Sequence, residues 1–264
     1  MLLQDKVAVV YGGGGAIGGA VARVYAREGA RVFLAGPTEA KLAAVAGEIG
    51  AAAETDVVDA LDEDAVEAHT DGVVARAGRI DVCVNAVGIQ NGAQGKPLAE
   101  MSADEFGAPI RDYPRVNFTT ARAAARHMTA AGTGVIIGLS SPMARTATAL
   151  TGSFTMASAA VELLLRQLAA ELGPAGVRAV CLRLTGIPET ARSLGSSTEA
   201  TWRDAADRLG VSFEQMLEAV GAGSPLGRPL TVREVAEVAA FVASDRAGAL
   251  TATVVNVTGG AILD

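Results

Sequence analysis

Short runs of apolar residues alternate along the chain with longer segments in which apolar residues recur every three or four positions. The short runs cover residues 7–10, 31–35, 81–84, 135–139, 177–184 and 253–257, and residues 52–57 give one more short strand. Continuous apolar runs of this length are typical of parallel strands that are buried on both faces. Helical spacing covers residues 39–49, 63–76, 153–172 and 231–244. Because parallel neighbours need crossover helices, this alternation predicts an α/β fold with a doubly wound, seven-stranded parallel sheet.

The chain shows no boundary that would divide it into parts. No linker, internal repeat or low-complexity stretch separates one half from the other, so we expect a single domain over residues 1–264. The segment 188–223 differs from the rest, because it is polar, rich in small residues and helical only in places. We expect it to form a lid that covers a substrate.

One further helix is predicted in the middle of the chain. Ser102 and Glu105 have the spacing of a capping box, which marks a helix N-terminus. Pro109 and Pro114 follow inside the helical pattern, and proline removes a backbone N–H donor. We therefore expect a helix that these prolines interrupt and that continues to about Ala131.

A run of glycines directly follows the first predicted strand. Gly12 to Gly15 are consecutive, and Gly18 and Gly19 follow where a helical pattern begins. Glycine allows the backbone to approach a pyrophosphate closely, and a helix N-terminus offers free N–H groups and the positive end of its dipole. A strand, a glycine-rich turn and a helix in this order predict a site for the phosphates of a dinucleotide.

The composition argues against several classes of protein. The formal charge is −7 at pH 7 and the isoelectric point is near 5.0, which disfavours nucleic acid or an anionic membrane surface as a partner. No apolar run has the length of a membrane span or the form of a signal peptide, so we expect a cytoplasmic protein. Cys83 and Cys181 lie in predicted buried strands without metal-ligand spacing, which indicates reduced core thiols and no metal site.

Six segments resemble, in order and spacing, the motifs of the short-chain dehydrogenase/reductase family. They are YGGGGAIG from Tyr11, Asp56-Val57, DVCVNAVG from Asp81, GVIIGLSS from Gly134, TGIPET from Thr185 and VVNVTGG from Val254. The resemblance implies a Rossmann fold, an NAD(P) cofactor, hydride transfer on a small carbonyl, alcohol or enone, and assembly as a homodimer or homotetramer. It also implies that the cofactor is bound by Gly12, Gly14, Gly15, Ile17, Gly18, Thr38, Asp56, Val57, Asn85, Ala86, Gly88, Gly186 and Pro188.

The catalytic positions depart from the family pattern. With Ser141 as the family's serine, the tyrosine thirteen residues later is replaced by Phe154, and the lysine four residues beyond is replaced by Ser158. Counting without gaps places Tyr113 at the position of the helix asparagine, and Asn117 takes that position only if four residues are inserted. Phenylalanine has no proton to give, so a proton would come from Ser141, Tyr113, water or the substrate itself.

The choice between NAD and NADP is open at the end of the second predicted strand. An acidic residue there would bind a ribose hydroxyl, and a following arginine would bind a 2′-phosphate, but Gly36 and Pro37 occupy these positions. Thr38 and Lys41 are the nearby groups able to reach a phosphate, which favours NADP.

Two readings of the function remain. The first is an oxidoreductase with a non-standard active site. The second is a non-redox protein on the same scaffold, such as a nucleotide-binding pseudoenzyme, an isomerase, a dehydratase or a cyclase. A catalytically silent subunit that supports an active paralogue is a further alternative, which the intact glycine-rich turn disfavours. Arg183 lies in a predicted buried strand, where a structural ion pair competes with anion recognition as its role. We expect His69 to be structural, and Met128 and Met156 to fill the core.

Overall fold

The computed structural model describes residues 1–89, 93–192, 197–220, 222 and 224–263. Within them, seven strands form one sheet in the order β3-β2-β1-β4-β5-β6-β7, and all neighbouring strands are parallel. The strands are β1 (Val7–Tyr11), β2 (Arg31–Gly36), β3 (Ala53–Val57), β4 (Val82–Asn85), β5 (Gly134–Ser140), β6 (Val177–Leu184) and β7 (Thr253–Val257). The doubly wound parallel sheet predicted from the sequence is confirmed.

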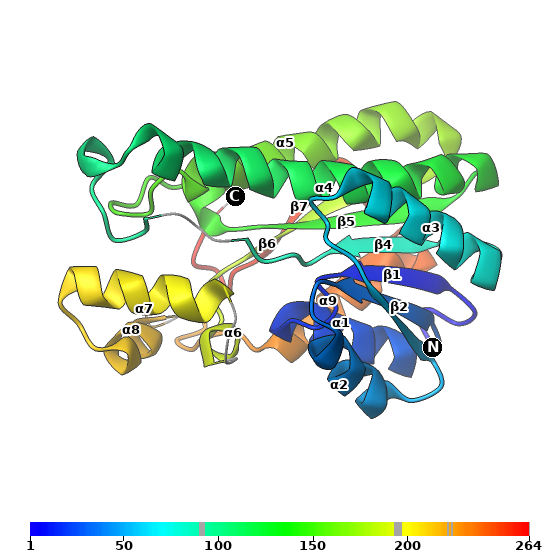
Figure 1. Cartoon of the computed structure of the whole chain (residues 1–264), viewed down its shortest axis with the longest axis horizontal. Coiled ribbons are helices and arrows are strands. Elements are labelled where there is room, and N and C mark those ends of the chain that lie inside the picture. Colours follow the sequence, from blue (N-terminus) through cyan, green and yellow to red (C-terminus); the bar gives the residue numbers. More distant parts are fainter. Residues whose placement is uncertain (90–92, 193–196, 221, 223, 264) are drawn as a thin grey trace.

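Helices lie on both faces of the sheet and in a group beyond one end of it (Figure 1). They are α1 (Ala16–Arg27), α2 (Glu39–Ile49), α3 (Glu63–Ala77), α4 (Ala103–Ala131), α5 (Phe154–Leu172), α6 (Pro188–Arg192), α7 (Ser197–Leu209), α8 (Phe213–Ala219) and α9 (Val232–Ala243). Single 3₁₀ turns occur at Leu98–Glu100, Pro142–Ala144, Gly173–Ala175 and Asp245–Ala247. None of the helices in the described part of the chain is long and apolar enough to cross a membrane.

Two hydrophobic cores are separated by the sheet. Alternate residues of a strand point to opposite faces, so Val10 packs with α1, α2 and α9, whereas Val9 packs with α3, α4 and α5. Both valines are fully buried. Because helices cover both faces of the sheet, the central strands consist mainly of apolar residues, and this pattern identifies them in the sequence.

The order of the strands creates a switch point beside β1. From β1 the chain runs outward to β2 and β3, then returns to the other side of β1 to form β4. The connections that follow β1 and β4 therefore diverge in opposite directions at the carboxyl edge of the sheet. In open α/β sheets ligands bind at such a divergence.

Helix α4 differs from the sequence expectation. The capping box of Ser102 and Glu105 is present, and the Glu105 N–H donates to the Ser102 Oγ at 3.2 Å. The prediction that Pro109 and Pro114 interrupt the helix is wrong, because Ala103–Ala131 is one continuous helix of 29 residues. Packing against the sheet and α5 outweighs the two missing N–H donors.

The two methionines expected in the core have different environments. Met128 is fully buried beneath the sheet, as expected. The expectation for Met156 is wrong, because 42% of this residue is exposed on the outer side of α5. An apolar residue type does not by itself indicate which side of a helix faces the core.

Candidate functional site

The predicted site residues lie in a row along the carboxyl edge of the sheet. Asp56 and Val57 end β3, the glycine-rich turn (residues 12–18) follows β1, Asn85 ends β4, Ser141 follows β5, and Gly186 and Pro188 follow β6. The strand order therefore spreads them from the β3 side to the β6 side with the glycine-rich turn between them. The remaining residues are Thr38 before α2, Ala86 and Gly88 after β4, Tyr113 on α4, and Phe154 and Ser158 on α5.

The glycine-rich turn has no room for side chains at two positions. Gly12 has a φ of +76°, and a Cβ there would lie 2.4 Å from the Ala86 carbonyl oxygen. A Cβ on Gly18 would lie 2.2 Å from the Gly12 carbonyl oxygen. Helix α1 begins just after Gly15, which caps it without any side-chain hydrogen bond. The first-turn N–H groups of α1 are therefore not capped by a side chain, an arrangement that suits an anion.

Tyr11 does not fill the space next to this turn. Its ring is 1% exposed and packs in the core on the side of α3, α4 and α5. Its hydroxyl lies 3.0 Å from His69 Nδ1. Ala16, which replaces a glycine of the family motif, is the first residue of α1 and adds a single methyl group. The residues of the turn therefore fit a pyrophosphate.

Polar groups gather at the β2 and β3 ends of the row. Thr38 caps α2 through its backbone only, so its side chain makes no cap hydrogen bond. The Asp56 Oδ2 accepts a hydrogen bond from Arg76 Nη2 at 2.7 Å and lies 3.3 Å from His69 Nε2. Val57 is 62% exposed, which makes it an open apolar surface beside the carboxylate. A flat aromatic base with an amino group fits these neighbours.

A pair of serine hydroxyls occupies the catalytic end of the row. Ser141 Oγ lies 3.1 Å from Ser158 Oγ, and either can be the donor. Ser158 is completely buried, whereas Ser141 is half-buried. Ser141 also donates to the Met143 sulfur at 3.4 Å, a weak acceptor that a substrate oxygen would readily replace. Ser141 is therefore placed to meet a ligand, with Ser158 behind it.

Two aromatic rings form a wall beside these serines. The ring centroids of Tyr113 and Phe154 are 5.6 Å apart with the planes tilted by 32°. The Tyr113 hydroxyl donates to the Leu139 carbonyl of β5 at 2.9 Å. Burial raises the pKa of Tyr113 above its ordinary value, so the phenol holds its proton tightly. In this arrangement the phenol proton is directed to the backbone.

A buried ion pair binds Ser140, the residue before Ser141, and the sequence analysis identified only one of its two members. Glu162 on α5 binds Arg183 on β6 through two hydrogen bonds, at 2.8 and 3.0 Å, and also accepts from Ser140 at 2.9 Å. Arg183 is 1% and Glu162 4% exposed. The expectation of a structural ion pair for Arg183 is confirmed. Glu162 could have been found as the one acidic residue on the buried side of that apolar helix, one turn after Ser158.

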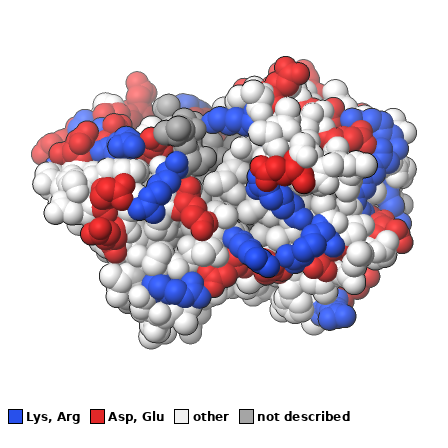
Figure 2. Space-filling view, turned by 90° about the horizontal axis from the view of Figure 1, so that it is seen from below, with Lys and Arg blue, Asp and Glu red and all other residues white. Residues whose placement is uncertain are grey.

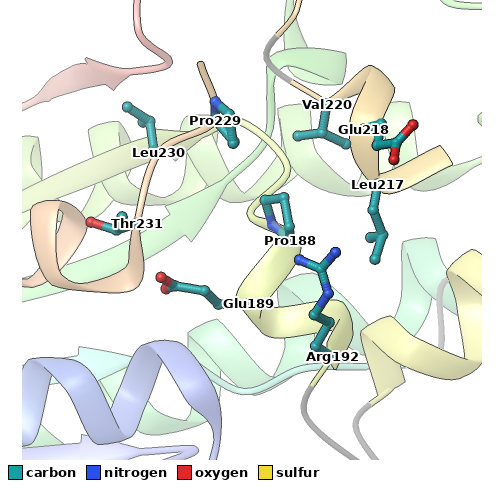
Figure 3. Close-up of a pocket in the computed structure, with 9 residues that line it drawn as sticks. All are labelled: Pro188, Glu189, Arg192, Leu217, Glu218, Val220, Pro229, Leu230 and Thr231. Carbon is teal, nitrogen blue, oxygen red and sulfur yellow. The ribbon is translucent and has the colours of Figure 1, made fainter. Parts of the chain in front are cut away.

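The expected lid region is built from three short helices, α6, α7 and α8; residues 193–196, 221 and 223 of it lie outside the described part. The indole of Trp202 on α7 packs on Gly186, where a Cβ would come within 2.8 Å of the ring. Helices α6 and α8 and the segment before α9 line an open pocket of about 340 Å³. Figure 3 shows Pro188 at its centre, with Arg192 and Glu189 below and Leu217 beside it.

Metal ligands, thiols and surface charges are three further features of the molecule that bear on its chemistry. Among the described residues, no three His, Cys, Asp or Glu side chains come together as a metal site. Burial raises the pKa of both Cys83 and Cys181 to about 12, so neither thiol is a nucleophile near neutral pH. Figure 2 shows acidic and basic side chains interspersed over the face that carries α1, α2 and α6. Such a mixed surface does not resemble a nucleic-acid track.

The sheet order and the glycine-rich turn at the switch point define a Rossmann-type α/β protein. The sequence model of a family described as enoyl-(acyl carrier protein) reductase matches residues 14–261. The chain is 31% identical to (+)-cis,trans-nepetalactol synthase NEPS2 of Nepeta racemosa, over 98% of this chain and 94% of that protein. It is 32% identical to cis-4-hydroxycyclohexanecarboxylate dehydrogenase of Sinomonas cyclohexanicum, over 97% of this chain and 96% of that protein.

A solved structure, that of levodione reductase, superposes with a TM-score of 0.87 at 27% identity and covers 98% of both chains. The chain therefore belongs to the short-chain dehydrogenase/reductase family, whose members are NAD(P)-dependent oxidoreductases that act on small molecules.

Proposed function

We propose that the protein catalyses NAD(P)-dependent hydride transfer on a small carbonyl, alcohol or enone with a non-standard active site. The observation that carries the proposal is the glycine-rich turn, in which Gly12 and Gly18 leave no space for a Cβ and α1 begins without a side-chain cap. Such a turn brings backbone N–H groups within reach of phosphate oxygens. A bound nicotinamide would supply or accept the hydride; the protein would bind, orient and protonate.

The cofactor is assigned to the residues of the sheet edge. Gly12, Gly14, Gly15, Ile17 and Gly18 would hold the pyrophosphate, and Asp56 and Val57 would bind the adenine base, with the Asp56 carboxylate as acceptor for its amino group. Thr38, whose hydroxyl makes no cap hydrogen bond, together with Lys41, favours NADP over NAD. Asn85, Ala86 and Gly88 would border the central part of the dinucleotide, and Gly186 and Pro188 would border its nicotinamide end.

Ser141 is proposed as the group that binds the substrate oxygen. If Ser158 donates to Ser141 across their 3.1 Å contact, the Ser141 proton is directed to the ligand. Phe154 takes the position of the family's tyrosine and Ser158 that of its lysine, so no charged group tunes the donor. Phe154 and Tyr113 form the apolar wall, and the Tyr113 proton stays on the Leu139 carbonyl.

Calorimetry with NADPH and NADH, followed by a panel of ketones and enones, tests this function. We expect NADPH to bind more tightly and to be oxidised by at least one substrate. Ser141→Ala should lower kcat by about 10²-fold or more, whereas Thr148→Ala, an exposed position in the following loop, should not. Failure of both cofactors to bind at millimolar concentration would refute the proposal.

A reverse experiment tests the assignment of the catalytic positions. Phe154→Tyr together with Ser158→Lys restores the family's phenol and ammonium one helix turn apart. We expect this double variant to gain reductase activity toward simple ketones. No gain, with NADPH still bound, would show that the cleft holds its ligands in a different pose.

A non-redox reaction is the second candidate, and the aromatic wall favours it. Phe154 carries no acid, and the Tyr113 hydroxyl is engaged by the backbone, so the strongest positioned donor is a serine. Dehydration, cyclisation or isomerisation of a bound substrate demands less of such a site than ketone reduction does. One relative is named as a synthase of a cyclic alcohol, nepetalactol. Product formed without net loss of reduced nicotinamide would establish this alternative.

We also propose that the protein is a cytoplasmic homodimer or homotetramer. Helices α4 and α5 pack against each other and carry exposed apolar side chains: Phe118 is 43%, Met156 42% and Leu163 65% exposed. Exposed apolar groups of this size are common at subunit interfaces. The free, buried Cys83 and Cys181 suit a reducing compartment. Light scattering on the purified protein would refute the assembly if it gave a monomer.

A further inference from the structure

Three residues on neighbouring strands form a row at the carboxyl edge of the sheet. Tyr11 on β1 pairs in register with Ala35 on β2, and Ala35 pairs with Asp56 on β3. Residues paired in a parallel sheet point to the same face, so these three side chains lie on the face covered by α3. The row thus brings a phenol and a carboxylate to the two sides of a single methyl group.

The small size of Ala35 leaves room for His69. This histidine enters from α3 with its side chain 2% exposed, and its two ring nitrogens meet the two ends of the row. Nδ1 lies 3.0 Å from the Tyr11 hydroxyl, and Nε2 lies 3.3 Å from Asp56 Oδ2. The Tyr11 and His69 rings meet edge to face, with centroids 5.3 Å apart. The imidazole therefore bridges two strands that are not neighbours.

The chemistry of the partners fixes where the protons lie. An ionised carboxylate can only accept, so the nitrogen that faces Asp56, Nε2, carries the hydrogen. Nδ1 then has a lone pair, and the Tyr11 hydroxyl donates to it. Burial lowers the pKa of His69, which keeps the ring neutral, and raises the pKa of Tyr11, which keeps the phenol protonated. Both directions agree with this single arrangement.

Two side chains contact the same carboxylate oxygen, and one of them, Arg76, donates a hydrogen bond to it. Arg76 Nη2 donates to Asp56 Oδ2 at 2.7 Å, and His69 approaches that oxygen from the core side. Arg76 is itself held by Glu54 at 3.1 Å and lies over the ring of Phe33. The other oxygen, Oδ1, makes neither contact, and the Asp56 side chain is 28% exposed. One oxygen is thus anchored while the other remains available at the strand end.

We propose that Tyr11 and His69 are positioning residues that orient the Asp56 carboxylate to recognise the amino group of the adenine base, an inference that rests on the proposed dinucleotide function. This relay of Tyr11, His69 and Asp56 acts on a single feature of the ligand, the amino group of the adenine base. Hypoxanthine carries an oxygen in place of that amino group and would face Asp56 with an acceptor. The relay therefore sets the selectivity for adenine over hypoxanthine rather than the affinity for the dinucleotide as a whole.

The test compares NADP⁺ with nicotinamide hypoxanthine dinucleotide phosphate by calorimetry on the intact protein. We expect the wild type to prefer the adenine form by about tenfold or more, as for a hydrogen bond to a charged group. Tyr11→Phe and His69→Gln should each reduce this ratio about fivefold through weaker adenine binding, with the hypoxanthine affinity unchanged. Asp56→Asn should reduce the ratio further. His127→Gln on α4 is the matched control, and its ratio should equal that of the wild type.

The outcomes separate the two proposals. A wild type that binds neither dinucleotide refutes the dinucleotide function and this inference with it. A wild type that binds both equally, variants that keep the wild-type ratio, or variants that weaken both ligands alike would refute this inference alone.

A second measurement needs no ligand. The chain has 2 histidines, so the His127→Gln variant leaves one imidazole in the nitrogen spectrum. That signal should show hydrogen on Nε2 at neutral pH, and hydrogen on Nδ1 would overturn the relay.

Discussion

Removing the cation of the buried ion pair should destabilise the protein more than a typical single substitution. Arg183 is 1% exposed and makes two hydrogen bonds, at 2.8 and 3.0 Å, to Glu162, which is 4% exposed. Arg183→Met leaves the Glu162 charge in the core with Ser140 as a remaining donor. Loss of one partner of a buried pair costs about 3–5 kcal/mol. At roughly 2–4 °C per kcal/mol for a chain of this size, Tm should fall by about 12 °C.

Thermal unfolding followed by circular dichroism, at one protein concentration and scan rate, gives the measurement. The double variant Arg183→Met with Glu162→Leu removes both charges and should recover most of the lost Tm, because well-packed apolar residues replace a buried pair at little cost. A single variant that loses less than about 3 °C, or a double variant that loses the sum of the two single effects, would show that the pair is not coupled as the contacts indicate.

Three further predictions concern the glycine-rich turn, His69 and the packing of Trp202 on α7. Gly18→Ala should weaken dinucleotide binding at least tenfold, because its Cβ would lie 2.2 Å from a carbonyl oxygen, whereas Gly47→Ala meets nothing within 4 Å and should leave binding unchanged in calorimetry. Burial lowers the pKa of His69 in the folded state, so its neutral ring contributes fully to stability above the unfolded-state pKa of about 6.5, and this contribution declines as the pH falls below that value. His69→Gln should therefore reduce the loss of Tm between about pH 7.5 and about pH 5. An unchanged dependence of Tm on pH would contradict this. The chain has a single tryptophan, Trp202, so the change in protein fluorescence on NADPH binding reports on α7. Gly186→Ala should shift the fluorescence of the ligand-free protein, because the added methyl group displaces the indole. An unchanged spectrum in both experiments would refute the packing of Trp202 on Gly186.

The centre of the sheet could be predicted because β1, β2, β4, β5 and β6 are buried on both faces and are largely apolar in sequence, whereas the outer strands β3 and β7 are only partly buried. The functional site could be predicted from the sequence only where a residue type is diagnostic by itself, as the glycines of the turn are for phosphate binding. Pairings between distant elements were not predictable: Arg183 indicated an ion pair, but its partner Glu162 depends on how α5 lies on β6. In the same way the contact of His69 with Asp56 follows from the register of β1, β2 and β3, which no local pattern shows.

The two prolines inside α4 make the helix uneven in stiffness. Pro109 and Pro114 cannot donate to the carbonyls four residues before them, so two hydrogen bonds are missing within the first four turns. The part of α4 after Pro114 packs against β4 and β5, and Val116 and Met128 in it are almost completely buried. We therefore expect the beginning of α4, which also carries Tyr113, to open more readily than the rest of the helix, with faster amide hydrogen exchange there.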